Sequence, residues 1–216
     1  MEDGDTIDVM MEMIGGCIAA PLPLKFSLSH ASRPDTALLL HPALLAQATS
    51  QDALALALRL GGDPTARPER FTFNGIGGDT KARVLCAASC AVLVSWLDMA
   101  HNAAGGSGTD FHQVLRPPEL ALLIGSEAVG RLGTVFGCEP YNLIKLRRVA
   151  AAAGECIGFH TDTHSLRTLH VALNDEQEYR GGRSVFVSAA GFEMPPRPAG
   201  SGTIHTHQLV HGVTPV

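Results

Sequence analysis

The segment FHTDTH, at residues 159–164, places a histidine and an aspartate one residue apart in a largely apolar stretch. In an extended strand, residues i and i+2 face the same side, so His160 and Asp162 would present an imidazole and a carboxylate side by side. Such a pair supplies two ligands for one metal ion, and a chance pair on the surface is the alternative. A third ligand elsewhere in the chain would decide between the two.

Histidines gather in the C-terminal part of the chain, where six of the ten lie between residues 160 and 211. Three of them, His205, His207 and His211, alternate within TIHTHQLVH and therefore share strand parity. Six residues of strand span about 20 Å, so one ion cannot bind both ends of this run if the strand is straight. Two histidines and one carboxylate on one face of an ion are typical of non-haem iron(II) oxygenases, because the other positions stay open for a cosubstrate and dioxygen.

Several motifs follow the histidine–aspartate pair in a definite order. FHTD at 159–162 is followed by LHVALND at 169–175, GGRSVF at 181–186 and HGVTPV at 211–216. In this order and spacing the C-terminal part resembles the 2-oxoglutarate- and iron(II)-dependent dioxygenases, specifically their prolyl 4-hydroxylase-like branch. The resemblance covers residues 141–216 and implies a double-stranded β-helix, or jelly roll.

The resemblance implies the roles of five residues. His160, Asp162 and His211 become the iron ligands and the catalytic centre, since the HGV context selects His211 over His205 and His207. Thr168 and His170 share a strand face that borders the 2-oxoglutarate pocket in this family. The cofactor is then Fe(II), with 2-oxoglutarate as cosubstrate and ascorbate as a further cofactor. The reaction is hydroxylation of a C–H bond in a prolyl residue of a protein or peptide, in another side chain, or in a small molecule.

Two features depart from the family pattern. The family anchors the distal carboxylate of 2-oxoglutarate with an arginine or lysine on a strand beyond the distal histidine, and no basic residue follows His211 before Val216. We expect that anchor beyond Val216, in a sequence truncated within the jelly roll; the alternative is substitution by Arg167, Arg147 or Arg148. The stretch VAAAAGEC at 149–156 also lacks the tyrosine that many prolyl hydroxylases carry there, which weakens the case for a prolyl substrate.

Three alternatives stay open at this point. A non-catalytic metal-binding module on the same fold would keep the ion but lack a functional 2-oxoglutarate anchor. A cupin-like protein would use His205 and His207 as an HxH pair, but it needs a following glutamate and none occurs between 208 and 216. A zinc hydrolase is compatible with the ligand types of the triad, although no general base is evident near the motif.

The elements that position these residues change character along the chain. Helices are expected at 51–60 after a Ser50 cap, at 81–100 after Asp79 or Thr80, and from Pro117 to Gly137, with a glycine-rich loop at 103–109. Short β-type runs follow at 142–149, 157–161, 168–173, 184–188 and 203–210. We therefore predict an α+β protein with a helical N-terminal half packed on a C-terminal jelly roll. The expected division is 1–110 and 111–216, or one continuous domain with the N-terminal region as support.

The composition restricts the class of protein. Hydrophobic residues make up 45% and charged residues 17% of the chain, which suits a packed core. The net charge of −5 and the lack of a basic cluster argue against nucleic-acid and membrane partners, and the acidic start MEDGDTID is unlike a secretory signal. Five cysteines at irregular spacing, without a CxxC pair, predict no disulfide framework and no thiolate zinc site. We expect a soluble, cytoplasmic protein.

Overall fold

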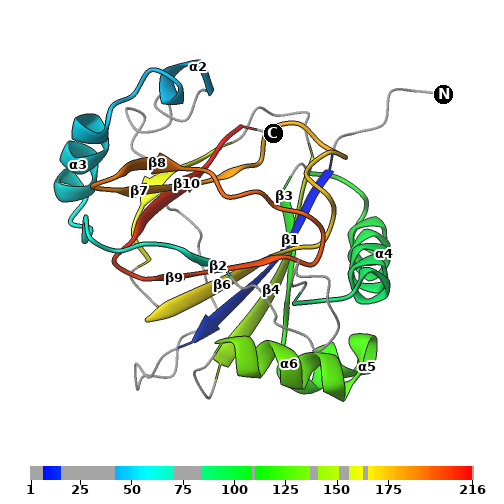
Figure 1. Ribbon diagram of the computed structural model, residues 1–216. Coiled ribbons are helices and arrows are strands. Elements are labelled where there is room, and N and C mark those ends of the chain that lie inside the picture. Colours follow the sequence, from blue (N-terminus) through cyan, green and yellow to red (C-terminus); the bar gives the residue numbers. More distant parts are fainter. Residues whose placement is uncertain are drawn as a thin grey trace, which may run out of the picture.

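Two antiparallel sheets and five helices make up the described part of the chain, residues 7–15, 42–70, 84–108, 110–136, 141–150, 156–162 and 165–215 of a computed structural model (Figure 1). The six-stranded sheet contains, in spatial order, β2 (Glu69–Arg70), β9 (Gly202–Thr206), β6 (Arg167–Ala172), β1 (Ile7–Gly15), β4 (Tyr141–Ala150) and β3 (Asp110–Leu115). The four-stranded sheet contains β5 (Ile157–His160), β10 (Val210–Val213), β7 (Ser184–Ser188) and β8 (Gly191–Glu193). The chain is therefore a mixed α/β protein.

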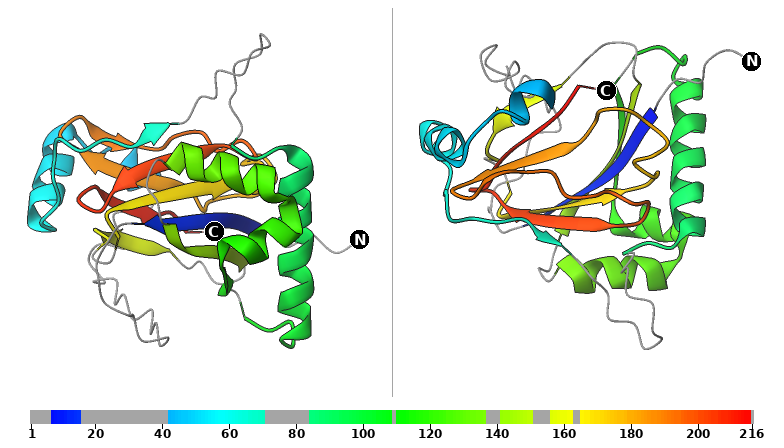
Figure 2. Two further views of the ribbon diagram at one scale, coloured as in Figure 1. Left: turned by 90° about the horizontal axis from the view of Figure 1, so that it is seen from below. Right: turned by 45° about the horizontal axis from the view of Figure 1, so that its top comes forward.

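The helices lie on the outer sides of the two sheets (Figure 2). They are α2 (Pro42–Leu45), α3 (Ser50–Arg59), α4 (Ala87–Ala103), α5 (Pro117–Ile124) and α6 (Ser126–Phe136). Helices α4, α5 and α6 share one apolar cluster with β4, β6 and β9, whereas α3 shares a second cluster with β5, β7 and β10. Each sheet thus has its own apolar core, on the face turned away from the other sheet.

Side chains along each strand point alternately toward the apolar core and toward the space between the two sheets. In β6, Leu169 and Val171 belong to the helix-facing cluster, so Thr168 and His170 face the other sheet. In β7, Val185 and Val187 pack toward α3, and Phe186 faces inward. Both strands are buried along nearly their whole length because both of their faces are covered. The side turned to the other sheet is the polar side in β6.

A crossing segment, residues 61–70, connects α3 on one sheet with β2 on the other. Within it, the N–H of Asp63 donates to the carbonyl oxygen of Gln208 at 2.9 Å, and the carbonyl oxygen of Pro64 accepts from the N–H of Ala189 at 2.8 Å. Arg67 donates to the hydroxyl of Ser188. The segment therefore ties the β9–β10 and β7–β8 turns together at one end of the two sheets.

Gly62 allows the crossing segment to lie this close to the sheet. A Cβ at this position would clash with Cγ2 of Val210 and lie 3.0 Å from the carbonyl oxygen of Gln208. Val210 directly precedes His211, so the approach at Gly62 bears on the backbone that carries the distal histidine.

The predicted helices are confirmed in kind and corrected at their ends. Thr49, not Ser50, caps α3, because Thr49 and Asp52 form a reciprocal capping box. The long helix begins after Cys86, and its expected caps lie outside the described residues. The third predicted helix is two helices, since Gly125 adopts a positive φ of 86° and ends α5.

The predicted strands are also present, with one important error. The strand expected at 203–210 is interrupted by a turn at residues 207–209, and its two parts, β9 and β10, belong to different sheets. Strands β1, β2, β3 and β8 were not predicted. The division at residue 110 stays a prediction, although β1 and β2 from the first region lie in the same sheet as β6 and β9 from the second. None of the helices in the described ranges has the length and apolar character that a membrane crossing requires.

Candidate metal centre

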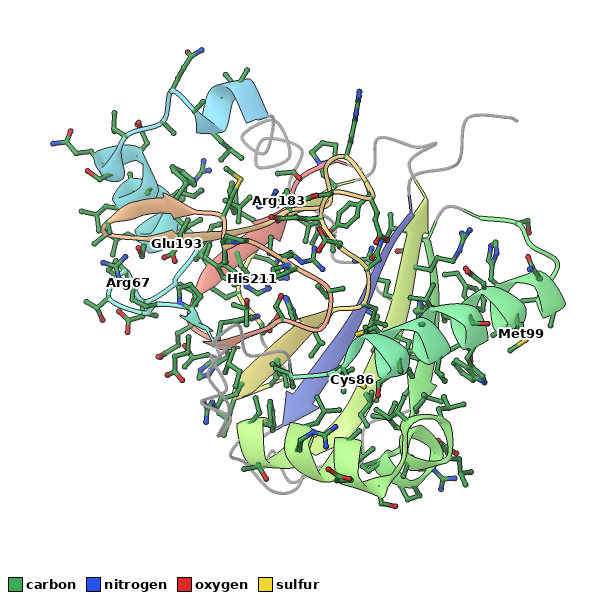
Figure 3. All side chains as sticks on the ribbon, turned by 45° about the vertical axis from the view of Figure 1, so that its right-hand side comes forward. Arg67, Cys86, Met99, Arg183, Glu193 and His211 are labelled. Atoms are coloured by element: carbon green, nitrogen blue, oxygen red, sulfur yellow. The ribbon has the colours of Figure 1, made fainter. Side chains whose placement is uncertain are left out.

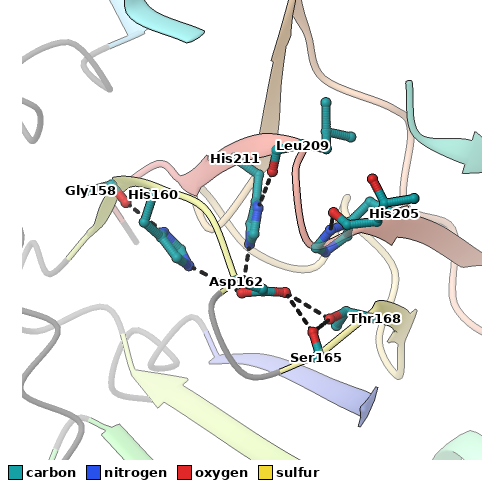
Figure 4. A network of polar contacts seen from close by, with 9 residues as sticks. Gly158, His160, Asp162, Ser165, Thr168, His205, Leu209 and His211 are labelled. Carbon is teal, nitrogen blue, oxygen red and sulfur yellow. Dashed lines mark hydrogen bonds and ion pairs between the residues drawn. The ribbon is translucent and has the colours of Figure 1, made fainter. Parts of the chain in front are cut away.

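The three predicted ligands come together between the sheets (Figure 4). His160 is the last residue of β5, Asp162 follows two residues later, and His211 lies on β10 opposite His160 in the antiparallel register. One potential ligand atom from each of the three lies within 4.8 Å of the other two. Figure 3 places His211 in the interior, whereas Met99 on α4 projects outward and is 61% exposed.

Backbone carbonyl groups orient both imidazoles. Nδ1 of His160 lies 2.9 Å from the carbonyl oxygen of Gly158, and Nδ1 of His211 lies 3.0 Å from that of Leu209. A carbonyl oxygen can only accept, so each Nδ1 carries the proton and donates it in these bonds. Each Nε2 then keeps its lone pair, as a metal-binding imidazole requires.

The two oxygens of the Asp162 carboxylate have different surroundings. Oδ2 accepts a hydrogen bond from Thr168 Oγ1 at 2.7 Å, and Ser165 Oγ lies 3.5 Å from Oδ2 and 3.0 Å from the threonine hydroxyl. Oδ1 lies 3.7 Å from Nε2 of His160 and 3.7 Å from Nε2 of His211. One oxygen is therefore fixed by hydroxyl groups, and the other faces the two imidazoles.

Asp162 is ionised in this environment. Burial acts to raise its pKa, but the positive charges that His211 and His205 carry when protonated lower it, and the hydrogen bond from Thr168 adds to that effect. The resulting pKa lies well below the ordinary value of 3.8. A carboxylate that stays charged at neutral pH is the form that binds a metal ion.

The geometry fits a divalent transition metal. Ligand atoms that lie about 2.1 Å from one ion are separated from each other by about 3 to 4 Å, and the nitrogen–oxygen distances here are 3.7 Å. Two imidazole nitrogens and one carboxylate oxygen are the donor types of a facial triad for non-haem iron, and zinc accepts the same donors. No cysteine of the described ranges belongs to the ligand group.

Two further histidines from the six-stranded sheet face the triad. The ring of His205 lies 4.2 Å from that of His211 and 5.0 Å from that of His170, centroid to centroid, and Phe186 lies 5.5 Å from His205. Both histidines are buried, and neither belongs to the group of ligand atoms. His170 and His205 therefore line the site without belonging to the three candidate ligands.

The pKa of His170 is lowered to about 3, first by burial and then by the positive charge that His211 carries when protonated, against the opposing effect of Asp162. The positive charges of Arg197 and Lys145 also act to lower it. The imidazole of His170 is therefore neutral at neutral pH.

The shared strand face expected for His205, His207 and His211 is wrong, because the turn at 207–209 separates them. His207 is half-buried in that turn, with Nδ1 3.4 Å from the carbonyl oxygen of Leu166, and it does not join the ligand group. His164, the last residue of the FHTDTH segment, lies outside the described residues.

Each arginine considered as a substitute anchor for 2-oxoglutarate forms an ion pair with a carboxylate. Arg147 binds Asp110 through two hydrogen bonds of 2.8 and 2.7 Å, Arg148 lies 3.0 Å from Asp98, and Arg167 lies 3.5 Å from Glu69.

Sequence reasoning missed a different arginine. Arg197, in the loop between β8 and β9, is only 4% exposed, and its Nη1 donates to the carbonyl oxygen of Gly182 at 2.7 Å. Its position in the proline-rich segment EMPPRPAG gave no sign of burial.

Comparison with protein-family models, curated proteins and solved structures finds no match to this chain.

Replacing Thr168 by valine should weaken metal binding. The substitution keeps the shape of the side chain but removes the donor to Asp162 Oδ2, and losing such a support typically costs about 10- to 100-fold in metal affinity. Iron(II) affinity, measured by competition with a coloured chelator, is the readout. Ser165→Ala is the matched control, because its contact with Asp162 is longer, at 3.5 Å. An equal loss in both variants would contradict the assigned role of Thr168.

His170 should make the metal-free protein sensitive to acid. Its folded-state pKa is about 3, so the unfolded chain binds an extra proton once the pH falls below about 6.5. Titration of His170 therefore leaves the free energy of unfolding unchanged above pH 6.5. Between pH 6.5 and pH 3 it lowers that free energy by up to about 1.4 kcal/mol for each pH unit of acidification. His170→Gln should show a shallower decrease in urea-unfolding free energy between pH 6.5 and 4.5, a range above the ordinary pKa of Asp162. Parallel curves for the two proteins would refute this.

Proposed function

We propose that this protein is an Fe(II)- and 2-oxoglutarate-dependent dioxygenase that hydroxylates a C–H bond. The observation that carries the proposal is the convergence of two Nε2 atoms and Asp162 Oδ1, with both Nδ1 atoms occupied by backbone carbonyl groups. This is the donor set that a facial triad for non-haem iron needs. Such a site leaves coordination positions open, which structural metal sites do not.

The arrangement of the sheets is compatible with the double-stranded β-helix that the motifs imply. The HxD motif begins at the last residue of β5, and its partner histidine lies on the neighbouring strand β10, so two distant motifs become adjacent through strand pairing. The GGRSVF motif leads into β7, which pairs with β10 on the side opposite to β5. Membership of the prolyl 4-hydroxylase-like branch, and the jelly-roll fold itself, remain part of the proposal.

The residues of the chain divide the work at such a centre. His160, Asp162 and His211 would hold iron, which supplies the site for dioxygen activation and for chelation of the keto acid. Thr168 keeps the carboxylate in place through its 2.7 Å hydrogen bond. His170 is buried and neutral, so it can contact the cosubstrate without adding a positive charge beside the ion.

Arg197 is the best candidate for the cation that binds the remote carboxylate of 2-oxoglutarate. It is buried, and its charge acts on His170, whose ring lies 6.1 Å from that of His211. Ser184, two residues beyond Gly182 on β7, has a buried hydroxyl without a hydrogen-bond partner among the described residues. A guanidinium and a hydroxyl together are suitable donors for a carboxylate.

The substrate side of the proposal is broader. The substrate is a prolyl residue of a protein or peptide, another side chain or a small molecule. Ascorbate serves as a reductant, and the protein is cytoplasmic. The alternative function, a metal-binding module without catalysis, differs from the oxygenase in one measurable respect. It binds iron but not the keto acid.

Anaerobic titration with iron(II), followed by 2-oxoglutarate, tests the function. We expect the weak visible charge-transfer band of an iron–keto-acid chelate in the wild-type protein. His160→Ala and Asp162→Ala should abolish iron binding and the band, whereas His205→Ala should retain iron, because His205 is outside the ligand group. Iron binding without a band would favour the non-catalytic module. Loss of iron in His205→Ala but not in His211→Ala would show that the distal ligand is misassigned.

Arg197→Met should weaken 2-oxoglutarate binding by about a hundredfold or more, since removing one partner of a buried charge pair costs about 3–5 kcal/mol. Binding of 2-oxobutanoate, a keto acid without the remote carboxylate, should change little. The chelate band gives both affinities. Arg167→Met is the comparison, and a selective loss of 2-oxoglutarate affinity in that variant instead would move the anchor to Arg167.

A further inference from the structure

Strand β1 lies inside the six-stranded sheet, although it comes from the N-terminal end of the chain (Figure 1). It pairs antiparallel with β4 along Ile7–Gly15 and with β6 along Met10–Gly15. Strands β4 and β6 are not neighbours, because β1 lies between them. Among the described residues, β1 alone connects the two parts of the sheet.

The remainder of the sheet consists of two separate parts, β2-β9-β6 and β4-β3. Without β1, strands β4 and β6 would each present unpaired N–H and C=O groups along an edge in the middle of the sheet. Unpaired backbone groups are costly when they are buried, and open strand edges bind other strands. The slot between β4 and β6 therefore requires an extended segment of chain.

The slot borders the metal centre through β6. In the register of the sheet, Ile14 of β1 lies opposite Thr168 and Glu12 lies opposite His170. Thr168 is the donor that fixes Asp162, and His170 lines the site. The strand that supports the aspartate is therefore paired with β1 on one side and with β9 on the other.

The connections of β1 in the sequence are long. Residues 16–41 separate β1 from α2, and neither partner strand is joined to it by a hairpin, since β4 begins at Tyr141 and β6 at Arg167. Pairing therefore depends on main-chain hydrogen bonds over a large sequence separation. Strand addition of this kind also occurs when the strand is supplied by a different chain.

We propose that β1 is a separable complementing strand, and that the metal centre forms only when the slot between β4 and β6 holds this segment of the same chain. Withdrawal of β1 lowers metal affinity by releasing β6, and return of the strand restores it. The N-terminal segment is in this way a switch for the metal centre. The inference concerns metal binding alone and goes beyond the proposed oxygenase chemistry.

A full-length Met11→Pro variant tests the proposal. Met11 pairs with Leu146 on one side and Val171 on the other, and proline removes a ladder hydrogen bond and is not tolerated in a central strand. Iron(II) affinity should fall by about tenfold or more. A synthetic peptide of residues 1–16 should restore it in a saturable manner, whereas the same peptide carrying Met11→Pro should not. Met11→Ala in the full-length chain is the control for side-chain loss, and it should bind iron more tightly than the proline variant.

Two results would overturn the proposal. One is unchanged iron affinity in full-length Met11→Pro, and the other is a weakened variant that the wild-type peptide does not restore. A specific protease site inserted between residues 15 and 42 provides a second measurement on a chain with an intact strand. After cleavage, dilution should release the N-terminal piece and iron together, and retention of iron after that release would contradict the coupling. Both experiments measure iron binding alone. Failure of this proposal can therefore be distinguished from failure of the proposed oxygenase function, which would appear in the titration with 2-oxoglutarate.

Discussion

An ionised carboxylate enclosed between two sheets is the constraint on which the rest of the structure depends. Asp162 is largely enclosed, and a charge in such a place is strongly destabilising unless hydrogen bonds and opposite charges compensate it. Thr168 supplies a hydrogen bond, and the imidazoles of His160 and His211 surround the other oxygen. In the metal-free state the histidines would compensate the charge only when protonated, whereas a bound cation does so directly. A cation held by these three side chains would therefore stabilise the enclosed charge in a way that neutral imidazoles cannot.

The distribution of apolar contacts explains how the protein can maintain such an interior. Its two hydrophobic clusters lie on the outer faces of the sheets, one under α4, α5 and α6 and the other under α3. A large buried aliphatic or aromatic side chain contributes about 1.5–3 kcal/mol, so these clusters supply the stability that a polar inner face does not. The sheets are joined across the polar space by ring contacts and, at the metal end, by the crossing segment of residues 61–70.

The sequence predicted the local features of the site better than its long-range ones. The spacing of His160 and Asp162 and the context of His211 were sufficient to name the group that the structure brings together. The break between β9 and β10 was missed because the segment THQL contains neither glycine nor proline. Strand β1 was missed because its partners lie more than a hundred residues away, and pairing at that distance leaves no periodic signal beyond the strand itself. Arg197 was missed because a proline-rich loop is normally exposed.

The alternation that places stability on one face of a strand and chemistry on the other has a consequence for insertions and deletions. In β6, Leu169 and Val171 pack against the helices, and Thr168 and His170 face the metal centre. A deletion of one residue within this strand would exchange the two sets, because side chains alternate with a period of two. Leucine and valine would then enter the histidine-lined space, while threonine and histidine would lie under the helices. Variation in length should therefore be confined to the turns, and natural or engineered diversity in β6, β7 and β10 should consist of substitutions alone.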